Sequence, residues 1–333
     1  MLIAGLLSYV IYRQIFSRED AGQLFDNFKL HLQNGEIVYL LLVLILMPIN
    51  WLLESKKWQL LSANFEKQSL LESVKTVLGG VVCSLFSPAR IGEYGGRVLF
   101  VKAENNWKAV AATMVGSLSQ LVIVLSVGGI GLITWLSVYT ESSAWLGHYA
   151  LANPYVLLGI ILMWAFITLI GLAIYFNVDI FINILKRVKY INKFERFFQG
   201  ISVLKAYSQA DLWKALSYSF VRYLVYSVQY WLLLLFFGLN IGFLSAISGI
   251  STIFFIQTGV PLPPIWDLFA RGEVAIIVWG SFGANELSVL AATFSLWVIN
   301  LILPSILGLV FIVKINIIKS IGYDQKENKT FHS

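Results

Sequence analysis

Charged residues are scarce in this sequence. Among its 333 residues, 24 are Lys or Arg and 18 are Asp or Glu, so 13% of the chain is charged while 58% is hydrophobic. Soluble domains usually carry about 25% charged residues, because a fold in water needs a polar surface. The shortage excludes an ordinary soluble enzyme, a nucleic-acid-binding protein and a disordered regulator. The sequence predicts an integral membrane protein built from α-helices.

Residues for metal or covalent chemistry are scarce as well. Cys83 is the only cysteine, which excludes a disulfide within the chain and a cysteine metal site. The histidines His31, His148 and His332 are far apart, which argues against a histidine metal cluster. The sequence has no Walker loop, no Gly-x-Ser-x-Gly and no His-Glu-x-x-His. We therefore expect no metal, no cofactor and no catalytic residue, and the protein is not expected to be an enzyme.

Long apolar runs are abundant, and about 20 mostly apolar residues cross a bilayer as one helix. Met1–Ile11 is short and indicates an anchor or a truncated first helix, while Ser17–Gly35 has the spacing of an interfacial helix. Five clear spans follow near 36–53, 107–137, 154–176, 215–238 and 287–313. Asn50 and Pro48 interrupt the first of these and are interpreted as a cap for the loop that follows. We expect about six full spans in total.

Basic residues orient the spans, because cytoplasmic loops carry an excess of Lys and Arg. The segment 138–153 has neither, which places it outside. Both termini are then cytoplasmic, and the net charge of +6 reflects these loops. We expect residues 1–333 to form a single polytopic domain in the inner membrane. The basic regions assigned to the cytoplasm are Lys56, Lys57, Lys67 and Lys75, the loop 177–214, and the tail 314–333.

Two regions do not behave as simple spans. The orientation is consistent only if about 70–100 begins and ends inside and about 241–280 begins and ends outside. Each is therefore a re-entrant hairpin or a double crossing. The apolar arm Val77–Phe86 has ten residues, about half of what a bilayer requires at helical rise. This length favours re-entrant helical hairpins.

The two hairpin regions resemble each other in sequence. Each has a Gly-containing apolar arm broken by proline, then an Arg/Glu cluster, then a span. The spans open on the same tripeptide, Ala111–Thr113 and Ala291–Thr293, and an amide (Gln120 or Asn300) comes nine residues after the first alanine. The shared order favours an inverted repeat. Paired, interrupted segments of this kind indicate a transport site.

Charges in the first hairpin form the main candidate site. Ser87 is suited to cap a helix that starts at Pro88, and a helix N-terminus attracts anions. Arg90, Glu93 and Arg97 are spaced to lie on one face of that helix. Glu93 can pair with either arginine and leaves one positive charge, for which a lipid phosphate is the natural ligand. A salt bridge in a cytoplasmic loop is the alternative.

Further candidates lie in the second hairpin and in one span. Asp267 and Arg271 are i, i+4 partners, and Glu273 follows them. Two interpretations of this group stay open, a structural ion pair and a contact with the substrate. Arg222 either belongs to a polar stripe with neighbouring Ser219, Tyr226 and Gln229 or snorkels to the inner interface. The candidate substrate-binding residues are Ser87, Pro88, Arg90, Glu93, Arg97, Gln120, Arg222, Asp267, Arg271, Glu273 and Asn300.

The segment 87–97, Ser-Pro-Ala-Arg-Ile-Gly-Glu-Tyr-Gly-Gly-Arg, resembles a motif of the transmembrane region of lysylphosphatidylglycerol synthetases and their stand-alone, flippase-like relatives. That motif is Thr/Ser-Pro-x-Arg-x-Gly-Glu and a further Arg. The resemblance covers about 36–313, although Arg271-Gly272-Glu273 replaces a more usual Gly-x-Arg-Glu order. It implies two re-entrant hairpins and, in the synthetases, translocation of aminoacylated phosphatidylglycerol. Because about twenty residues follow the last span, we expect no aminoacyl-transferase domain and no lysyl transfer.

The leading hypothesis is a lipid translocator or lipid-binding protein. Its partner would be an anionic or aminoacylated phospholipid or a polyprenyl-phosphate-type lipid, not nucleic acid. Arg90 and Arg97 would hold the phosphate, and Glu93 would orient them. Two alternatives stay open: a membrane-embedded transferase acting on a lipid headgroup with Glu93 or Glu273 as base, and a scaffold for a separate synthase. A homo-oligomer is open as well.

Overall fold

The computed structural model describes residues 36–87, 90–139, 154–177, 202–259, 262 and 264–313, and its regular structure within these ranges is entirely helical. The predicted N-terminal segments Met1–Ile11 and Ser17–Gly35 lie outside the described residues. So does the predicted cytoplasmic tail 314–333. The structure therefore bears on the predicted fold from residue 36 onward.

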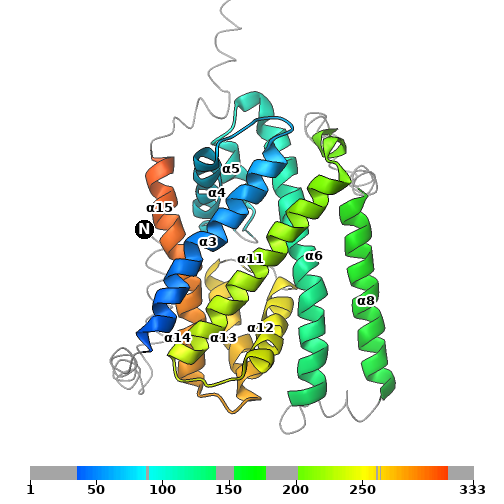
Figure 1. Ribbon diagram of the computed structural model, residues 1–333, viewed down its shortest axis with the longest axis vertical. Helices are drawn as coiled ribbons and strands as arrows, with labels where there is room; N and C mark the ends of the chain where they lie inside the picture. Colours follow the sequence, from blue (N-terminus) through cyan, green and yellow to red (C-terminus); the bar gives the residue numbers. More distant parts are fainter. Residues whose placement is uncertain are drawn as a thin grey trace, which may run out of the picture. The chain divides into compact units, whose positions relative to one another are not determined.

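Five helical stretches are long and apolar enough to cross a bilayer (Figure 1). They coincide with the five clear spans predicted from the sequence, so the chain is a multi-pass membrane protein. The last stretch is continuous through a π-helical segment, η6 (Val298–Ile302). The helices are α3 (Ile37–Ser62), α6 (Asn106–Tyr139), α8 (Pro154–Phe176), α11 (Gln209–Phe236), and α14 (Glu286–Trp297) continued by α15 (Leu303–Ile312).

The first of these helices is longer than the sequence predicts. The apolar run ends near residue 53, but α3 continues to Ser62 and passes through both Pro48 and Asn50 without a break. The interpretation of Asn50 as a cap is therefore wrong. Because the helix continues, Glu54 and Lys57 lie inside a candidate membrane span and not in the loop after it.

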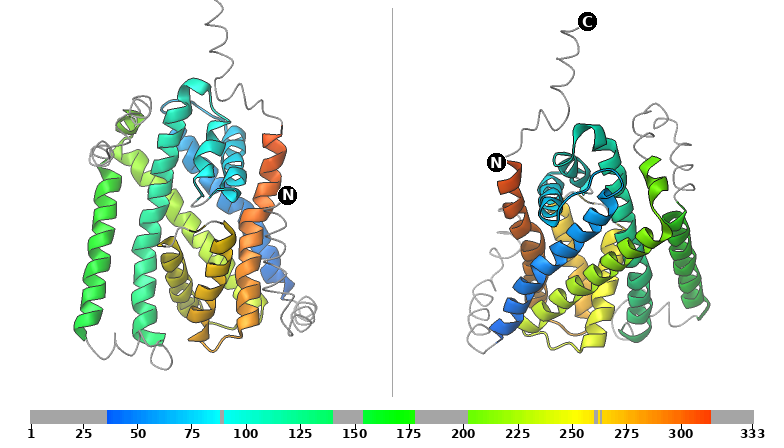
Figure 2. Two further views of the ribbon diagram at one scale, coloured as in Figure 1. Left: turned by 180° about the vertical axis from the view of Figure 1, so that it is seen from behind. Right: turned by 45° about the horizontal axis from the view of Figure 1, so that its top comes forward.

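Two packed helix pairs occupy the regions predicted as hairpins. The first pair is α4 (Leu70–Leu85) with α5 (Gly92–Val98), and the second is α12 (Phe243–Thr258) with α13 (Pro264–Gly280). Figure 2 shows the members of each pair side by side. With 16 residues each, α4 and α12 are about 24 Å long at helical rise, which is shorter than the hydrocarbon core of a bilayer. Their depth in the membrane stays a prediction.

The start of α4 is fixed by a capping box. The Ser69 hydroxyl accepts a hydrogen bond from the Glu72 backbone N–H, and the Glu72 carboxylate accepts one from the Ser69 N–H at 2.7 Å. These two bonds satisfy backbone donors that have no partner within the helix. Hydrogen bonds from Ser69 hold the pKa of the exposed Glu72 carboxyl below its ordinary value.

The capping box predicts a pH-dependent stability. A carboxyl whose pKa is lowered by folding stabilises the protein above its unfolded pKa, and this contribution is lost as the pH falls through the folded value. We expect the wild-type protein to unfold at a higher temperature than Glu72→Gln at neutral pH. The two should converge in acid, as followed by thermal unfolding. A difference that is the same at neutral and acid pH would show that the Glu72 charge is not its source.

The chain divides into two compact units, each assembled from three separate stretches. The α4–α5 unit contains residues 49–123, 166–223 and 301–333, and its core includes the fully buried Trp58 and Leu61. The α12–α13 unit contains residues 1–48, 124–165 and 224–300, and its core includes the fully buried Trp279 and Phe236. One helix pair therefore belongs to each unit.

The order of elements supports an internal repeat. A long helix, a 16-residue helix, its hairpin partner and another long helical stretch occur as α3–α6 and again as α11–α15, where the last stretch is α14 continued through η6 into α15. The shared Ala-Ala-Thr tripeptide lies in α6 and in α14. Thr113 and Thr293 are both buried, and each donates its hydroxyl to the carbonyl four residues earlier at 2.8 Å. The inverted relation between the two halves stays a prediction.

Candidate functional site

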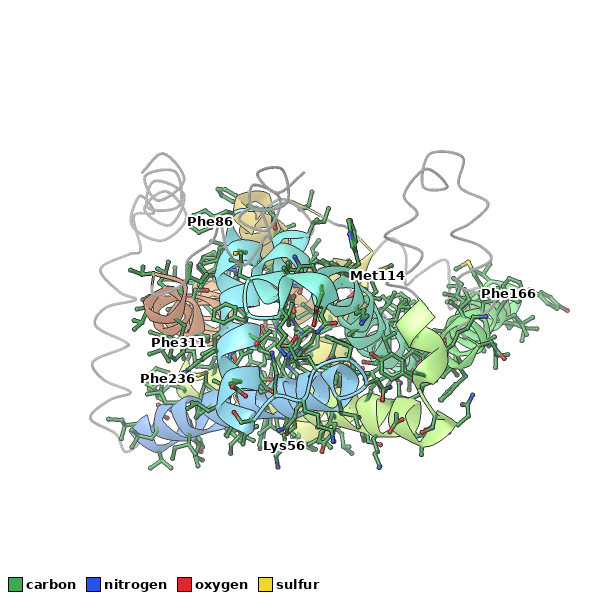
Figure 3. The ribbon with its side chains drawn as sticks, turned by 90° about the horizontal axis from the view of Figure 1, so that it is seen from above. Lys56, Phe86, Met114, Phe166, Phe236 and Phe311 are labelled. Carbon is green, nitrogen blue, oxygen red and sulfur yellow. The ribbon has the colours of Figure 1, made fainter. Side chains whose placement is uncertain are left out.

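A stripe of buried polar side chains runs along the second half of α3. Asn50, Glu54 and Lys57 follow at i, i+4 and i+7, a spacing that places them on one face of a helix. All three are at most 4% exposed. Glu54 lies about 12 Å of helix from the end of α3. Lys56, in contrast, is exposed and projects from the outer side of α3 (Figure 3).

Glu54 is the shared acceptor of three cations within the α4–α5 unit. Its Oε2 atom is 2.9 Å from Lys57 Nζ and 2.8 Å from Arg222 Nη1, and its Oε1 atom is 2.8 Å from Arg97 Nη2. Arg97 comes from α5 and Arg222 from α11, so three helices meet at one carboxylate. With Glu93, which also accepts from Arg97 Nη2, these residues form what we call the Glu54 cluster. Its members are Glu54, Lys57, Glu93, Arg97 and Arg222.

The two arginines of the cluster are held between carboxylates and aromatic rings. Arg97 lies over the Trp58 ring and Arg222 over the Trp51 ring, each with Cζ 5.0 Å from the ring centroid. Arg222 also donates from Nε to Asn50 Oδ1 at 2.9 Å. These contacts place the Arg222 guanidinium among polar and aromatic side chains of the α4–α5 unit. Its neighbours Tyr226 and Gln229, which the sequence placed in the same polar stripe, belong to the other unit.

Two donors of this region lack acceptors. Arg97 Nε and Trp51 Nε1 are buried and find no hydrogen-bond partner among the residues that the structure describes. A buried donor without a partner costs about 1–3 kcal/mol, more when the group is charged. Both atoms belong to side chains of the cluster or to a ring that packs on it. They are therefore the positions where an acceptor supplied by a ligand would be most stabilising.

Lys57 is surrounded by acceptors. Its Nζ atom donates to Gly116 O and to Ser219 Oγ, both at 3.1 Å, and pairs with Glu54. An ammonium group has three N–H donors, and here each has an acceptor. The prediction that Lys57 belongs to a cytoplasmic loop is wrong, because the side chain is only 2% exposed inside α3. It is a buried charge of the site.

The cluster carries more positive than negative charge. Lys57, Arg97 and Arg222 face the two carboxylates of Glu54 and Glu93, and the side chains are 2–18% exposed. At low dielectric an uncompensated charge is costly, so the excess cation favours an anion nearby. In chemical terms the arrangement can bind a monoanion that offers several oxygen acceptors.

Arg90 is near the cluster but is placed differently from the prediction. α5 begins at Gly92, not at Pro88, and Pro88 itself lies outside the described residues. Arg90 precedes the helix with φ +58°, a left-handed conformation that is uncommon for a side-chain-bearing residue. Its guanidinium is half-exposed and 3.7 Å from Glu93 Oε2. Glu93 therefore pairs with both arginines, as its spacing predicted.

The Ser87 hydroxyl accepts a hydrogen bond at the start of α5. It does not have the predicted role of N-cap for a helix that begins at Pro88. The Gly92 N–H donates to Ser87 Oγ at 2.6 Å, five residues away along the chain. With only seven residues, α5 is too short for its dipole to carry the anion-binding argument, which rests on side chains instead.

The second hairpin holds a separate polar group in the α12–α13 unit. Arg271 donates from Nε to Asp267 at 2.8 Å and from Nη1 to Gln257 at 3.0 Å, which links α13 to α12. The Asp267–Arg271 pair was predicted and is balanced in charge. Glu273 is exposed. This group is smaller and more open than the Glu54 cluster.

The paired amides are placed in different settings. Asn300 is buried in the π-helical segment η6 and donates to the Leu296 carbonyl at 3.3 Å. Gln120 has a buried Oε1 atom without a hydrogen-bond partner among the described residues.

Glu54 and Lys57 are site residues that sequence reasoning missed. The signal is present in the sequence, because Asn50, Glu54 and Lys57 follow one another at helical spacing, and Trp51 and Trp58 are adjacent to Asn50 and Lys57. Composition alone does not reveal it, because the apolar run stops near residue 53 and the charges that follow resemble the start of a loop.

Comparisons with curated proteins and with solved structures give no match. A comparison with family models does give one, over residues 2–310. These residues include all members of the Glu54 cluster and both helix pairs. The chain belongs to the family described as the lysylphosphatidylglycerol synthase TM region, a membrane domain associated with the synthesis and translocation of aminoacylated phospholipids.

Proposed function

We propose that the protein is a flippase-like lipid translocator that binds the phosphate of a membrane lipid at the Glu54 cluster. The observation that carries the proposal is the cation excess of this buried cluster, together with the unpartnered donor at Arg97 Nε. Ionisable groups within spans are costly and are found where substrates pass. A lipid phosphate supplies the missing negative charge and the missing acceptors.

Arginine is suited to this ligand. Its planar guanidinium presents several donors in a fixed fork that matches phosphate oxygens. Arg97 is nearly fully buried and oriented by two carboxylates, while Arg90 is half-exposed and carries its charge toward the surface of the unit. We propose that Arg90 meets the headgroup first and that Arg97 holds the phosphate. The lipid is an anionic or aminoacylated phospholipid or a polyprenyl-phosphate-type lipid.

The cluster supports binding and transport better than headgroup chemistry. Glu54 and Glu93 each accept from arginine, so both act as anionic partners of cations and not as free bases. We propose accordingly that the protein is not an enzyme. The hairpins are re-entrant, both termini are cytoplasmic in the inner membrane, and the second hairpin gates from the outer side. A separate synthase supplies a modified lipid where one is used.

Removal of the Arg90 charge tests the proposal. Arg90→Ala deletes a half-exposed side chain and should leave the fold intact, because it breaks only the 3.7 Å pair with Glu93. In vesicles reconstituted with the purified protein and a fluorescent phosphatidylglycerol, we expect transfer between leaflets to fall at least tenfold, the loss of about one charged hydrogen bond. Lys56→Ala removes an exposed lysine of α3 and is the matched control.

Two outcomes would contradict the proposal. If Arg90→Ala transfers lipid between leaflets at the wild-type rate, the lipid does not pass the Glu54 cluster. A new headgroup species in the lipids of cells that contain the protein, seen by mass spectrometry, would favour a transferase. Lipids that keep their structure but change leaflet support translocation.

A further inference from the structure

We propose that Lys57 binds a proton when the Glu54 cluster binds its anion, so that lipid binding is coupled to proton uptake. This inference rests on the proposed function, since it assigns a second, protonic substrate to the same site. Lys57 lies outside the motif 87–97 that carries the resemblance and has no role in the proposed phosphate contact. Its chemistry nevertheless differs from that of the other cations around Glu54.

Lys57 is the cation of the cluster that can release a proton. Arginine stays protonated in proteins, whereas a lysine in a buried environment can become neutral. The ionisable groups around Lys57 come from three helices: Glu54 from its own helix α3, Arg97 and Glu93 from α5, and Arg222 from α11. From α6 it meets a backbone carbonyl, that of Gly116.

The charge balance of the cluster depends on whether an anion is bound. Arg90 also faces Glu93, but its guanidinium is 52% exposed and is screened by solvent, so it does not enter the balance of the buried charges. Without an anion, the three cations of the cluster exceed its two carboxylates by one charge, and loss of the Lys57 proton restores the balance. With a phosphodiester bound, the balance is restored only when Lys57 is protonated. Because like charges repel strongly at low dielectric, the bound anion and the proton stabilise each other.

The hydrogen bonds of Lys57 suit both protonation states. Ser219 Oγ lies 3.1 Å from Lys57 Nζ and 2.7 Å from Ser119 Oγ, and either serine can be the donor of the second bond. When Lys57 is an ammonium, Ser219 accepts from it and donates to Ser119. When Lys57 is a neutral amine, the Ser219 hydroxyl turns to donate to the nitrogen lone pair. Ser219 then accepts from the Ser119 hydroxyl, which in the structure donates to the Gly116 carbonyl at 2.7 Å. Neither state leaves Nζ without a partner.

The coupling has a definite sign. Since the anion raises the proton affinity of Lys57, the proton raises the affinity for the anion by the same factor. Affinity is highest where Lys57 is already protonated in the free protein and falls as the pH rises above that point. For one linked proton the dissociation constant increases about tenfold per pH unit.

The test is calorimetry on the full-length purified protein in detergent, with the short-chain lipid dioctanoyl phosphatidylglycerol as the probe. Titrations in two buffers of different ionisation enthalpy give the number of protons taken up per lipid bound. Across about pH 6 to about pH 10, a range that reaches the ordinary ionisation of lysine, we expect uptake to rise toward about one proton. Lys57→Arg keeps the charge without a releasable proton, so it should bind with no uptake and no pH dependence.

A neutral variant completes the design. Lys57→Met has the shape of the side chain without the charge, so it should bind more weakly than the wild type at low pH, again without proton uptake. Binding by the wild type with no proton uptake at any pH overturns the inference and leaves the proposed function intact. Uptake that persists in Lys57→Arg assigns the proton to a carboxylate and also overturns it. No binding by the wild type contradicts the proposed function itself.

Discussion

Replacing Glu54 by glutamine should cost about 3–5 kcal/mol of stability, the usual consequence of removing one partner from a buried ion pair. The expected loss is this large because one carboxylate serves Lys57, Arg97 and Arg222, two of which are only 2% exposed. Without it, three cations of the cluster face only the Glu93 carboxylate. Proteins are stable by about 5–15 kcal/mol, so the variant should unfold far below the wild-type temperature or fail to accumulate.

A matched control and a double variant separate charge from shape. Glu104→Gln makes the same chemical change at an exposed position and should unfold like the wild type. Glu54→Gln combined with Lys57→Met returns the net charge of the cluster to its wild-type value of one excess cation and should recover part of the loss. A double-mutant cycle measured by thermal unfolding gives the coupling between the two residues. If Glu54→Gln and Glu104→Gln unfold at the same temperature, Glu54 is not the centre of the cluster.

The five described spans could be predicted because membrane crossing is a local property of composition and length. The end of α3 could not, because the charges of Glu54 and Lys57 resemble the start of a loop when the chain is read alone. They remain in the helix because Arg97 and Arg222, which are 43 and 168 residues away from Glu54, neutralise the carboxylate. Such partners are set by tertiary packing and leave no trace in a window of the sequence.

The same distinction holds for the ion pairs. Asp267–Arg271 and Glu93–Arg97 are i, i+4 pairs, and both form as their spacing predicts. The shared acceptor Glu54 joins three helices and had no local signal beyond its helical spacing from Asn50. Local pairs could therefore be predicted, while the residue that organises the site could not.

The start of α5 shows a local rule that is overridden. Ser-Pro is a common opening of a helix, and it predicted a helix from Pro88. In the structure Arg90 adopts a left-handed conformation and the Ser87 hydroxyl accepts from Gly92 instead. From Gly92 onward, α5 approaches α4 closely at glycines.

The second large effect is expected at one of those glycines. Gly96 of α5 lies against the backbone of α4, where an added Cβ would be 2.6 Å from Gly79 O and 2.7 Å from Gly80 Cα. Backbone atoms cannot move aside without separating the two helices. Gly96→Ala should therefore cost about 1–3 kcal/mol, as overpacking does. Because Arg97 is the next residue, its contact with Glu54 should be lost as well, and with it the binding of dioctanoyl phosphatidylglycerol.

The adjacent residue supplies the control for this prediction. A Cβ added at Gly95 would meet no atom within 4 Å, so Gly95→Ala should be neutral or stabilise α5 by up to about 1 kcal/mol, the usual preference of helices for alanine. Thermal unfolding and lipid binding of the two variants test the close approach of α4 and α5. Equal stability and equal binding would show that the helices are not in contact at Gly96. Reduced stability and reduced lipid binding in Gly96→Ala alone would show that the packing of α5 against α4 positions Arg97. The reason is that a shift of α5 moves Arg97 away from its carboxylates.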